Sequence, residues 1–203
     1  MRIRSSPIGA ILAGGAGLRI GGQKATVELH GKPLICYPLE AVCEVLKKVA
    51  ILTKSGTKLP PLSGVMVWIE PERPRHPLVD ITQALALAGG RPVLVCAADF
   101  PFVSPELVRR LVRTDPRRAP AVVAGAHAVV QPLLGCYQPK ALELLAGPAR
   151  AGTAPLLDVI GALDPVLVEA DDPEELFDVD TPDDLLMAAA LLDRRRVTTP
   201  RPY

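Results

Sequence analysis

The stretch IGAILAGGAGLRIGGQKATVELHGKPL, residues 8–34, begins with an apolar run and passes directly into a glycine-rich loop that carries two positive charges. The run IGAILA, residues 8–13, has the near-continuous apolar character of a strand that is buried on both faces, as in a parallel sheet. In open α/β sheets, ligands bind beyond the carboxyl ends of the strands. The glycine-rich loop therefore stands where an α/β protein is expected to bind a phosphate group.

The rest of the chain repeats this alternation of short apolar runs and segments with a helical period. The expected strands are residues 8–13, 49–53, 65–70, 92–99, 119–130, 132–138 and 165–170. The expected helices are residues 33–48, 77–88, 104–113, 139–147, 153–163 and 181–196. Such a rhythm is typical of βαβ units, and it predicts an α/β fold in which helices cover both faces of a mostly parallel central sheet.

The length and composition indicate one enzyme-sized domain. A chain of 203 residues can bury one continuous core, so we expect a single domain over residues 1–196 and a disordered tail over 197–203. Lys and Arg total 23 against 22 for Asp and Glu, a balance that argues against a nucleic-acid partner. No apolar run reaches the roughly 18 to 20 residues of a membrane helix, and no signal-peptide pattern opens the chain. We therefore expect a cytoplasmic monomer or small homo-oligomer, without a membrane partner, whose four cysteines are free core thiols.

Two well-known phosphate loops do not fit the glycine-rich segment. The P-loop requires Ser or Thr after its Gly-Lys pair, whereas Lys24 is followed by Ala25. The dinucleotide fingerprint GxGxxG would begin at Gly15 and Gly17, but Ile20 stands at its third glycine. Neither motif accounts for the loop.

A cradle of backbone amides remains as the interpretation of this loop. Gly14, Gly15 and Gly17 allow the main chain to approach an anion closely, and Arg19 and Lys24 add positive charge suited to a polyphosphate. The alternative is a plain glycine-rich turn with two solvated cations. Five glycines within nine residues favour the phosphate site, because short loops between strand and helix rarely need so many.

The string LAGGAGLRIGGQK, residues 12–24, resembles the LAGGxxxRMGxxK signature of nucleotidyltransferases, and most closely that of the molybdenum cofactor guanylyltransferase family. The similarity continues in the same order through ELHGKPLI (28–35), VLVCAADFPFVSPELV (93–108), QPLLGCYQPKAL (131–142) and FDVDTPDDL (177–185). Sugar-nucleotide and cytidylyl transferases share the first motif, whereas the ordered set is more specific. The resemblance implies a single-domain, three-layer, Rossmann-like nucleotidyltransferase fold.

The resemblance also implies a reaction. Such an enzyme transfers GMP from GTP to the terminal phosphate of molybdopterin with Mg²⁺ as cofactor, and pyrophosphate leaves. The alternatives are guanylyl transfer to adenosylcobinamide phosphate, cytidylyl transfer to molybdopterin, and, outside the enzymes, a catalytically inactive nucleotide-binding protein on the same scaffold. The glycine pair of LAGG favours guanine, since cytidylyl relatives often have LAAG.

The site residues implied by the resemblance fall into three overlapping groups. The nucleotide is expected to contact Leu12, Ala13, Gly14, Gly15, Gly17, Lys24, Thr53, Asp80 and Asp99. Arg19, Lys24 and Asp99 are expected to be catalytic. Asp99 and Asp180 are the expected metal ligands.

Two acidic segments carry the metal prediction. Asp99 ends the strand PVLVCAAD, so its carboxylate is expected at the ligand edge of the sheet, the alternative being an aspartate that merely starts a turn. Asp178 and Asp180 stand where the family usually has asparagine, and their alternation in an extended stretch predicts that they point to the same side. They are candidate ligands of a second or shared metal. The alternative for Asp180 is that it helps to cap the last helix beside Thr181.

The segment IEPERPRHPLVDI, residues 69–81, departs from the family pattern. Pro71 stands where the family often has an acidic residue, and Asp80 stands near the last glycine of its GPLxG turn. Asp80 can restore a carboxylate to the nucleotide side, and a similar placement occurs in the related archaeal guanylyltransferase that acts on cobinamide phosphate. The alternative is an exposed acid on the first turn of a helix.

Overall fold

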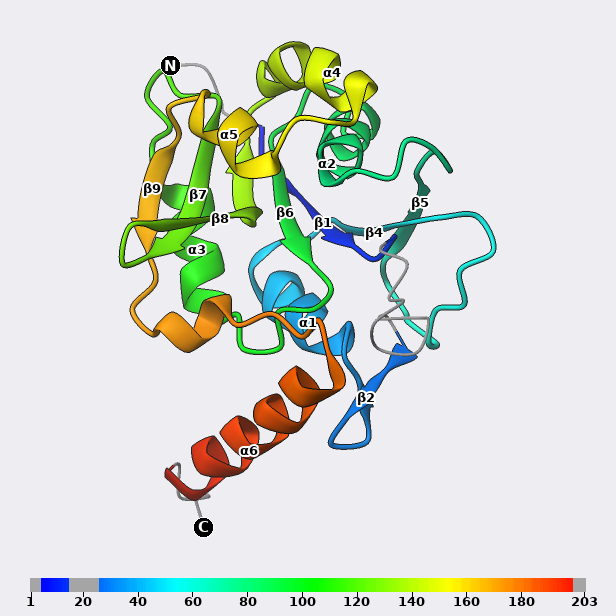
Figure 1. Ribbon diagram of the computed structural model, residues 1–203, viewed down its shortest axis with the longest axis vertical. Helices are drawn as coiled ribbons and strands as arrows, with labels where there is room; N and C mark the ends of the chain where they lie inside the picture. Colours follow the sequence, from blue (N-terminus) through cyan, green and yellow to red (C-terminus); the bar gives the residue numbers. More distant parts are fainter. Residues whose placement is uncertain (1–4, 15–25, 199–203) are drawn as a thin grey trace.

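The computed structural model describes residues 5–14 and 26–198, which form a three-layer α/β fold around a seven-stranded sheet (Figure 1). The strand order is β5-β4-β1-β6-β8-β7-β9. The strands are β1 (Ile8–Leu12), β4 (Val49–Thr53), β5 (Met66–Ile69), β6 (Val93–Ala97), β7 (Ala121–Ala126), β8 (Val129–Tyr137) and β9 (Val166–Glu169). Among these strands β8 alone runs antiparallel to its neighbours, so the predicted mostly parallel sheet is confirmed.

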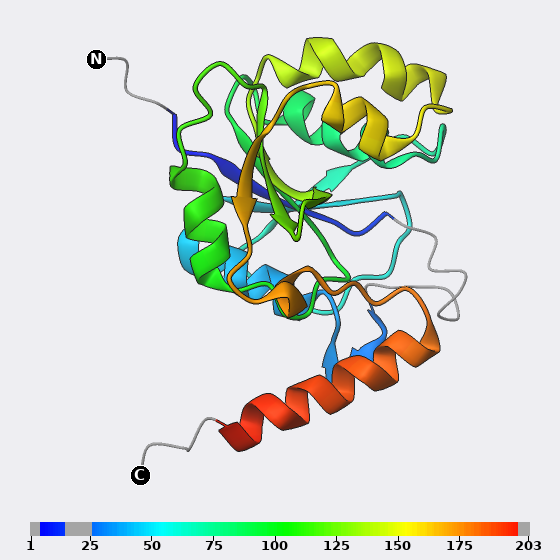
Figure 2. The ribbon, with the colours of Figure 1, turned by 60° about the vertical axis from the view of Figure 1, so that its left-hand side comes forward.

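Helices cover both faces of the sheet, as predicted (Figures 1 and 2). One face packs against α1 (Cys36–Val45) and α3 (Pro105–Arg113), and the other against α2 (Pro77–Leu87), α4 (Ala141–Ala151) and α5 (Leu156–Gly161).

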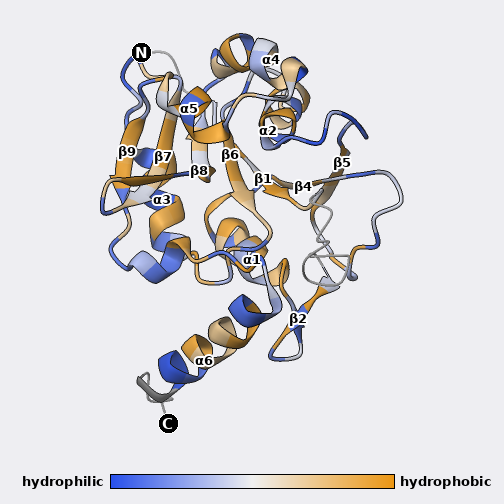
Figure 3. Ribbon diagram, in the orientation of Figure 1, coloured by the Kyte–Doolittle hydropathy of each residue, from blue (hydrophilic) through white to orange (hydrophobic). Residues whose placement is uncertain are grey.

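Alternate residues of β1 enter the two different cores. Ile11 packs with α1 and α3, whereas Ala10 and Leu12 pack with the helices of the opposite face. Burial on both faces explains why the central strands read as unbroken apolar runs, and the same strands are among the hydrophobic parts of the ribbon in Figure 3.

A third apolar cluster lies beside the sheet rather than on it. There α6 (Pro182–Thr198) packs on the short hairpin of β2 (Glu28–Leu29) and β3 (Lys32–Pro33) through Leu29, Leu34 and Leu191 (Figure 2). The helix extends to Thr198, two residues into the segment expected as a tail, and residues 199–203 lie outside the described residues. Within 5–14 and 26–198, no helix has the length and apolar character needed to cross a membrane.

Several boundaries differ from the sequence-based prediction. The helix expected over 33–48 is α1, which is shorter at both ends, and residue 33 belongs to β3. The strand expected over 119–130 is divided between β7 and the start of β8, which pair as an antiparallel hairpin, because His127 and Ala128 adopt φ values of 50° and 65° and reverse the chain between them. The helix expected over 139–147 continues through Pro148 and ends at Ala151, where Gly152 takes the left-handed conformation that closes many helices.

The four cysteines are free thiols, as predicted, but they do not all belong to the core. Cys96 and Cys136 are buried, Cys36 is half-buried and Cys43 is exposed.

Candidate active site at the carboxyl edge of the sheet

The carboxyl ends of four neighbouring parallel strands, β5, β4, β1 and β6, form one continuous edge. At this edge Ala13 N donates a hydrogen bond to Leu52 O (2.8 Å), and Ala98 N donates to Leu12 O (3.1 Å). The strand order reverses between β1 and β6, which is where open α/β sheets bind their ligands. The predicted site residues that lie at this edge are Leu12, Ala13, Gly14, Thr53 and Asp99. Gly15, Gly17, Arg19 and Lys24 lie outside the described residues.

Gly14 lies against the carboxylate of Glu70, the residue that follows β5. A Cβ atom on Gly14 would stand 1.6 Å from Glu70 Oε1 and 2.4 Å from its Cδ. The Glu70 side chain is 1% exposed, and its backbone N donates to Thr53 O (2.9 Å), which continues the pairing of β4 and β5. A side chain on Gly14 would therefore displace the buried carboxylate of Glu70.

Glu70 belongs to a buried charged cluster with Lys54 and Asp80. Lys54 Nζ lies 2.9 Å from Glu70 Oε1 and donates a hydrogen bond to Pro71 O (2.8 Å). Asp80 lies in the first turn of α2, where it is half-buried and its carboxyl faces Glu70. Burial raises the pKa of Asp80 to about 9, with Glu70 adding to the rise and Lys54 opposing it. The alternative that Asp80 is an exposed acid is therefore wrong.

Glu70 and Lys54 were not predicted as site residues. The family pattern places an acidic residue at the position of Pro71, whereas the structure has a buried carboxylate one residue earlier, at Glu70. Glu70 is the one charged residue in the apolar run 65–70, and Lys54 directly follows the apolar strand β4. A charged residue at the end of an apolar strand was thus the signal that pointed to both residues.

Thr53 supplies a buried hydroxyl at the same edge. Its residue is 2% exposed, and within the described part of the chain its Oγ1 atom has no hydrogen-bond partner. A buried hydroxyl without a partner is unfavourable by about 1–3 kcal/mol. A bound ligand that forms a hydrogen bond with the Thr53 hydroxyl would remove this unfavourable contribution.

A backbone hydrogen bond brings the two predicted acidic segments together. Val179 N donates to Asp99 O at 3.0 Å, so the segment that contains Asp178 and Asp180 lies beside the end of β6. Val179 is buried, Asp180 is half-buried and Asp178 is exposed. The two acidic segments, which are distant in sequence, therefore lie beside each other at one end of the sheet.

Thr181 and Asp184 cap the start of α6. Thr181 N and Oγ1 both donate to Asp184 Oδ2 at 2.8 Å, and Asp184 N donates to Thr181 Oγ1 at 3.2 Å. Asp180 takes part through its backbone N–H, which donates to the same carboxylate oxygen at 3.1 Å. The expected capping role is thus filled by the reciprocal Thr181–Asp184 pair, the arrangement of a capping box.

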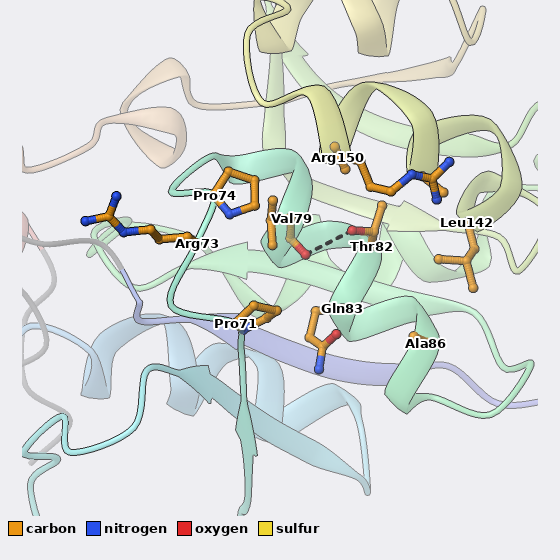
Figure 4. A pocket seen from close by; sticks show the side chains of 11 residues that line it. Pro71, Arg73, Pro74, Val79, Thr82, Gln83, Ala86, Leu142 and Arg150 are labelled. Carbon is orange, nitrogen blue, oxygen red and sulfur yellow. Dashed lines mark hydrogen bonds between the residues drawn. The ribbon is translucent and has the colours of Figure 1, made fainter.

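A separate cavity of about 340 Å³ lies between α2 and α4, next to the loop that follows β5 (Figure 4). Its lining is mostly apolar, with Arg73 and Arg150 at its margins. In Figure 4 the guanidinium groups of these two arginines lie on opposite sides of the labelled residues. Both arginines also line a second cavity of about 690 Å³, together with Pro74 and Arg75.

The parallel sheet, its switch point and the polar groups at its carboxyl edge together define a nucleotide-binding α/β protein. Residues 9–166 match the family model of the MobA-like NTP transferase domain, and the chain belongs to this family. It is a nucleotidyltransferase.

Relatives and solved structures agree with this assignment. The chain is 31% identical to a molybdenum cofactor guanylyltransferase from Cereibacter sphaeroides, over 91% of this chain and 96% of the relative. It is 30% identical to a probable molybdenum cofactor guanylyltransferase from Pyrococcus horikoshii, over 75% of this chain and 80% of the relative.

Two solved structures share the fold. The molybdopterin-guanine dinucleotide biosynthesis protein A of Archaeoglobus fulgidus superposes with a TM-score of 0.73 at 24% identity, over 92% of this chain and 99% of that one. The 2-C-methyl-D-erythritol 4-phosphate cytidylyltransferase of Thermus thermophilus superposes with a TM-score of 0.70 at 21% identity, over the same shares.

Proposed function

We propose that this protein transfers GMP from GTP to the terminal phosphate of molybdopterin in the cytoplasm, forming the guanine dinucleotide and releasing pyrophosphate. The observation that carries the proposal is the hydrogen bond from Val179 N to Asp99 O, which assembles two acidic segments at the strand ends where Gly14 opens the glycine-rich loop. The names of the relatives from Cereibacter sphaeroides and Pyrococcus horikoshii support the choice of nucleotide and acceptor.

The chemistry demands alignment and charge neutralisation more than a protein nucleophile. The terminal phosphate of the acceptor attacks the α-phosphorus of GTP, and negative charge gathers as the bond to pyrophosphate breaks. Backbone N–H groups of the loop that begins at Gly14 would hold the triphosphate, and Arg19 and Lys24 would stabilise the developing charge.

Asp99 and Asp180 are the groups that would hold a magnesium ion. Carboxylate oxygens suit this cation, which proteins commonly bind through one or two carboxylates together with substrate phosphates. Among residues 5–14 and 26–198, no group of three or more His, Cys, Asp and Glu side chains gathers to hold a metal by itself. These two carboxylates therefore fit an ion whose remaining ligands would come from a triphosphate. When bound, Mg²⁺ supplies positive charge at the phosphate oxygens.

Glu70 and Thr53 would distinguish guanine from cytosine. Guanine presents a ring N–H beside an amino group, two donors that one carboxylate can accept together, whereas cytosine presents its amino group beside an acceptor. The Glu70 carboxylate and the Thr53 hydroxyl are both buried at neighbouring strand ends. This pair favours guanylyl over cytidylyl transfer.

Nucleotide preference is measurable by thermal unfolding with Mg²⁺ and GTP, CTP, ATP or UTP. At about 100 times Kd the preferred nucleotide should add roughly 2.7 kcal/mol to the free energy of unfolding. We expect this stabilisation with GTP, and we expect Glu70→Gln to reduce the advantage of GTP over CTP, because an amide can accept from guanine with only one oxygen. Equal stabilisation by GTP and CTP would contradict the proposed base choice.

The acceptor is identified by pyrophosphate release from GTP in the presence of either molybdopterin or adenosylcobinamide phosphate. We expect release with molybdopterin. Release with cobinamide phosphate alone would transfer the assignment to that acceptor, and binding of GTP without release with either acceptor would show a catalytically inactive nucleotide-binding protein.

Asp99→Asn should raise the Mg²⁺ concentration needed for half-maximal turnover, because an amide is a weaker ligand than a carboxylate. Asp183→Asn is the matched control, since Asp183 is an exposed acid in the first turn of α6. The measurement is a Mg²⁺ titration of pyrophosphate release, with thermal unfolding to verify that both variants are folded. A titration of Asp99→Asn that coincides with that of the unmodified protein would remove Asp99 from the metal site.

A further inference from the structure

We propose that Asp80 is a positioning residue, which donates a hydrogen bond to the Glu70 carboxylate and holds it against Gly14 in the orientation that receives the base. The pairing of the two carboxyl groups stands on the geometry of the cluster. Its consequence for the choice of nucleotide rests on the proposed guanylyltransferase function.

The surroundings of Glu70 require a donor. Its side chain is 1% exposed, and within the described residues neither carboxylate oxygen accepts a hydrogen bond of good geometry. Lys54 provides an ion pair at Oε1, with Nζ at 2.9 Å, and the second group that faces Glu70 is the Asp80 carboxyl. Two ionised carboxylates would be two acceptors in repulsive contact, whereas one proton converts the pair into a donor and an acceptor.

The charge of the cluster places this proton on Asp80. The Lys54 ammonium group contacts the Glu70 carboxylate directly. Asp80 has a pKa raised to about 9, first by burial and then by Glu70, against the lowering effect of Lys54. With Lys54 and Glu70 charged and Asp80 neutral, the cluster has no net charge at pH 7.

Within the part of the chain that the structure describes, few other charged groups approach Asp80. His76 caps the same helix, where its Nδ1 atom accepts a hydrogen bond from Leu78 N (3.2 Å). Arg73 and Arg150 line the cavity beside α2, on the side of the helix that packs against α4. Among residues 5–14 and 26–198, the groups in electrostatic contact with Asp80 are Glu70 and Lys54.

Support from two sides fixes the Glu70 carboxylate. Lys54 follows β4 and Asp80 belongs to α2, so Glu70 is held from the sheet and from the covering helix. Gly14 closes a third side without a side chain. A carboxylate restrained in this way keeps its acceptor directions fixed before a base arrives, which lowers the entropic penalty of binding.

The pH dependence of stability tests the pair without any nucleotide. An unfolded Asp loses its proton near its ordinary pKa of 3.8, whereas folded Asp80 keeps it up to about pH 9. The folded state binds the extra proton in this window, so the contribution of Asp80 to stability decreases as pH rises from 4 to 9 and is constant above. Asp80→Asn keeps a donor and cannot titrate, so its unfolding constant relative to that of the unmodified protein should fall about tenfold per pH unit within the window.

The matched control is Asp158→Asn, because Asp158 is an exposed acid in the first turn of α5. Its unfolding constant should keep a fixed ratio to that of the unmodified protein across the same pH range, measured by urea unfolding at each pH. A fixed ratio for Asp80→Asn as well would overturn the proposed proton on Asp80.

Nucleotide binding tests the positioning role. In titrations with Mg²⁺ and either GTP or CTP, Asp80→Ala should reduce the preference for GTP about tenfold, because the Glu70 carboxylate loses one of its two supports. Asp80→Asn should restore the preference, and cooperative urea unfolding verifies that each variant is folded. Unmodified protein without a preference for GTP would refute the proposed base choice, whereas a clear preference that Asp80→Ala leaves unchanged would refute the role of Asp80.

Discussion

Replacement of Gly14 by alanine is expected to lower the free energy of unfolding by about 3 kcal/mol and to abolish the preference for GTP. The added Cβ would stand 1.6 Å from Glu70 Oε1 and 2.9 Å from Oε2, distances at which the carboxylate cannot remain. Its displacement would break the ion pair with Lys54 in a buried site. Urea unfolding and nucleotide titration measure the two effects.

Gly161→Ala is the control for this substitution. A Cβ on Gly161 would meet nothing within 4 Å, and Gly161 is the last residue of α5, so alanine should change the free energy of unfolding by less than about 1 kcal/mol. In a Glu70→Ala background, Gly14→Ala should cause a smaller additional loss of stability, because the colliding atoms are gone. An undiminished loss in that background would mean that the collision with Glu70 is not the cause.

Lys24→Ala should lower the turnover number by roughly 10² to 10³, the range observed when one donor to developing charge is removed from an active site. The expectation rests on the resemblance of the glycine-rich loop to the LAGGxxxRMGxxK signature, in which Lys24 occupies the final position. Initial rates of pyrophosphate release at saturating GTP measure the effect. Lys47→Ala removes an exposed lysine beyond α1 and should leave the rate unchanged. A rate for Lys24→Ala equal to that of Lys47→Ala would exclude Lys24 from the reaction.

The centre of the sheet was predictable because β1, β4 and β6 are buried on both faces. Residues such as Ile11 and Ala10 point into opposite cores, so neither position tolerates a polar side chain and the strands stand out as apolar runs. Elements without such a run were missed. The hairpin β2–β3 has two residues in each strand, and the 3₁₀ helix Pro173–Leu176 is one turn long. Both are too short to show the alternation of a strand or the periodicity of a helix in the sequence.

The candidate site was predictable where it follows from strand ends and not where it depends on packing between side chains. Thr53 and Asp99 were correctly placed at the carboxyl edge, since each lies at or just beyond the end of a parallel strand. Glu70 was missed because its importance comes from contact with Gly14, far away in sequence. The buried state of Asp80 likewise depends on Glu70 and Lys54, which no local pattern connects to the first turn of a helix.

The hydrogen bond between Val179 and Asp99 joins a late segment of the chain to the end of β6, so the acidic edge is completed only late in translation. The last strand of the sheet, β9, ends at Glu169, so a nascent chain that has left the ribosome up to this residue contains every strand of the sheet and Asp99. It still lacks Asp178 and Asp180, which lie on either side of Val179. A truncated chain that ends between Glu169 and Asp178 would contain every strand of the sheet and Asp99, but it would lack the second acidic segment.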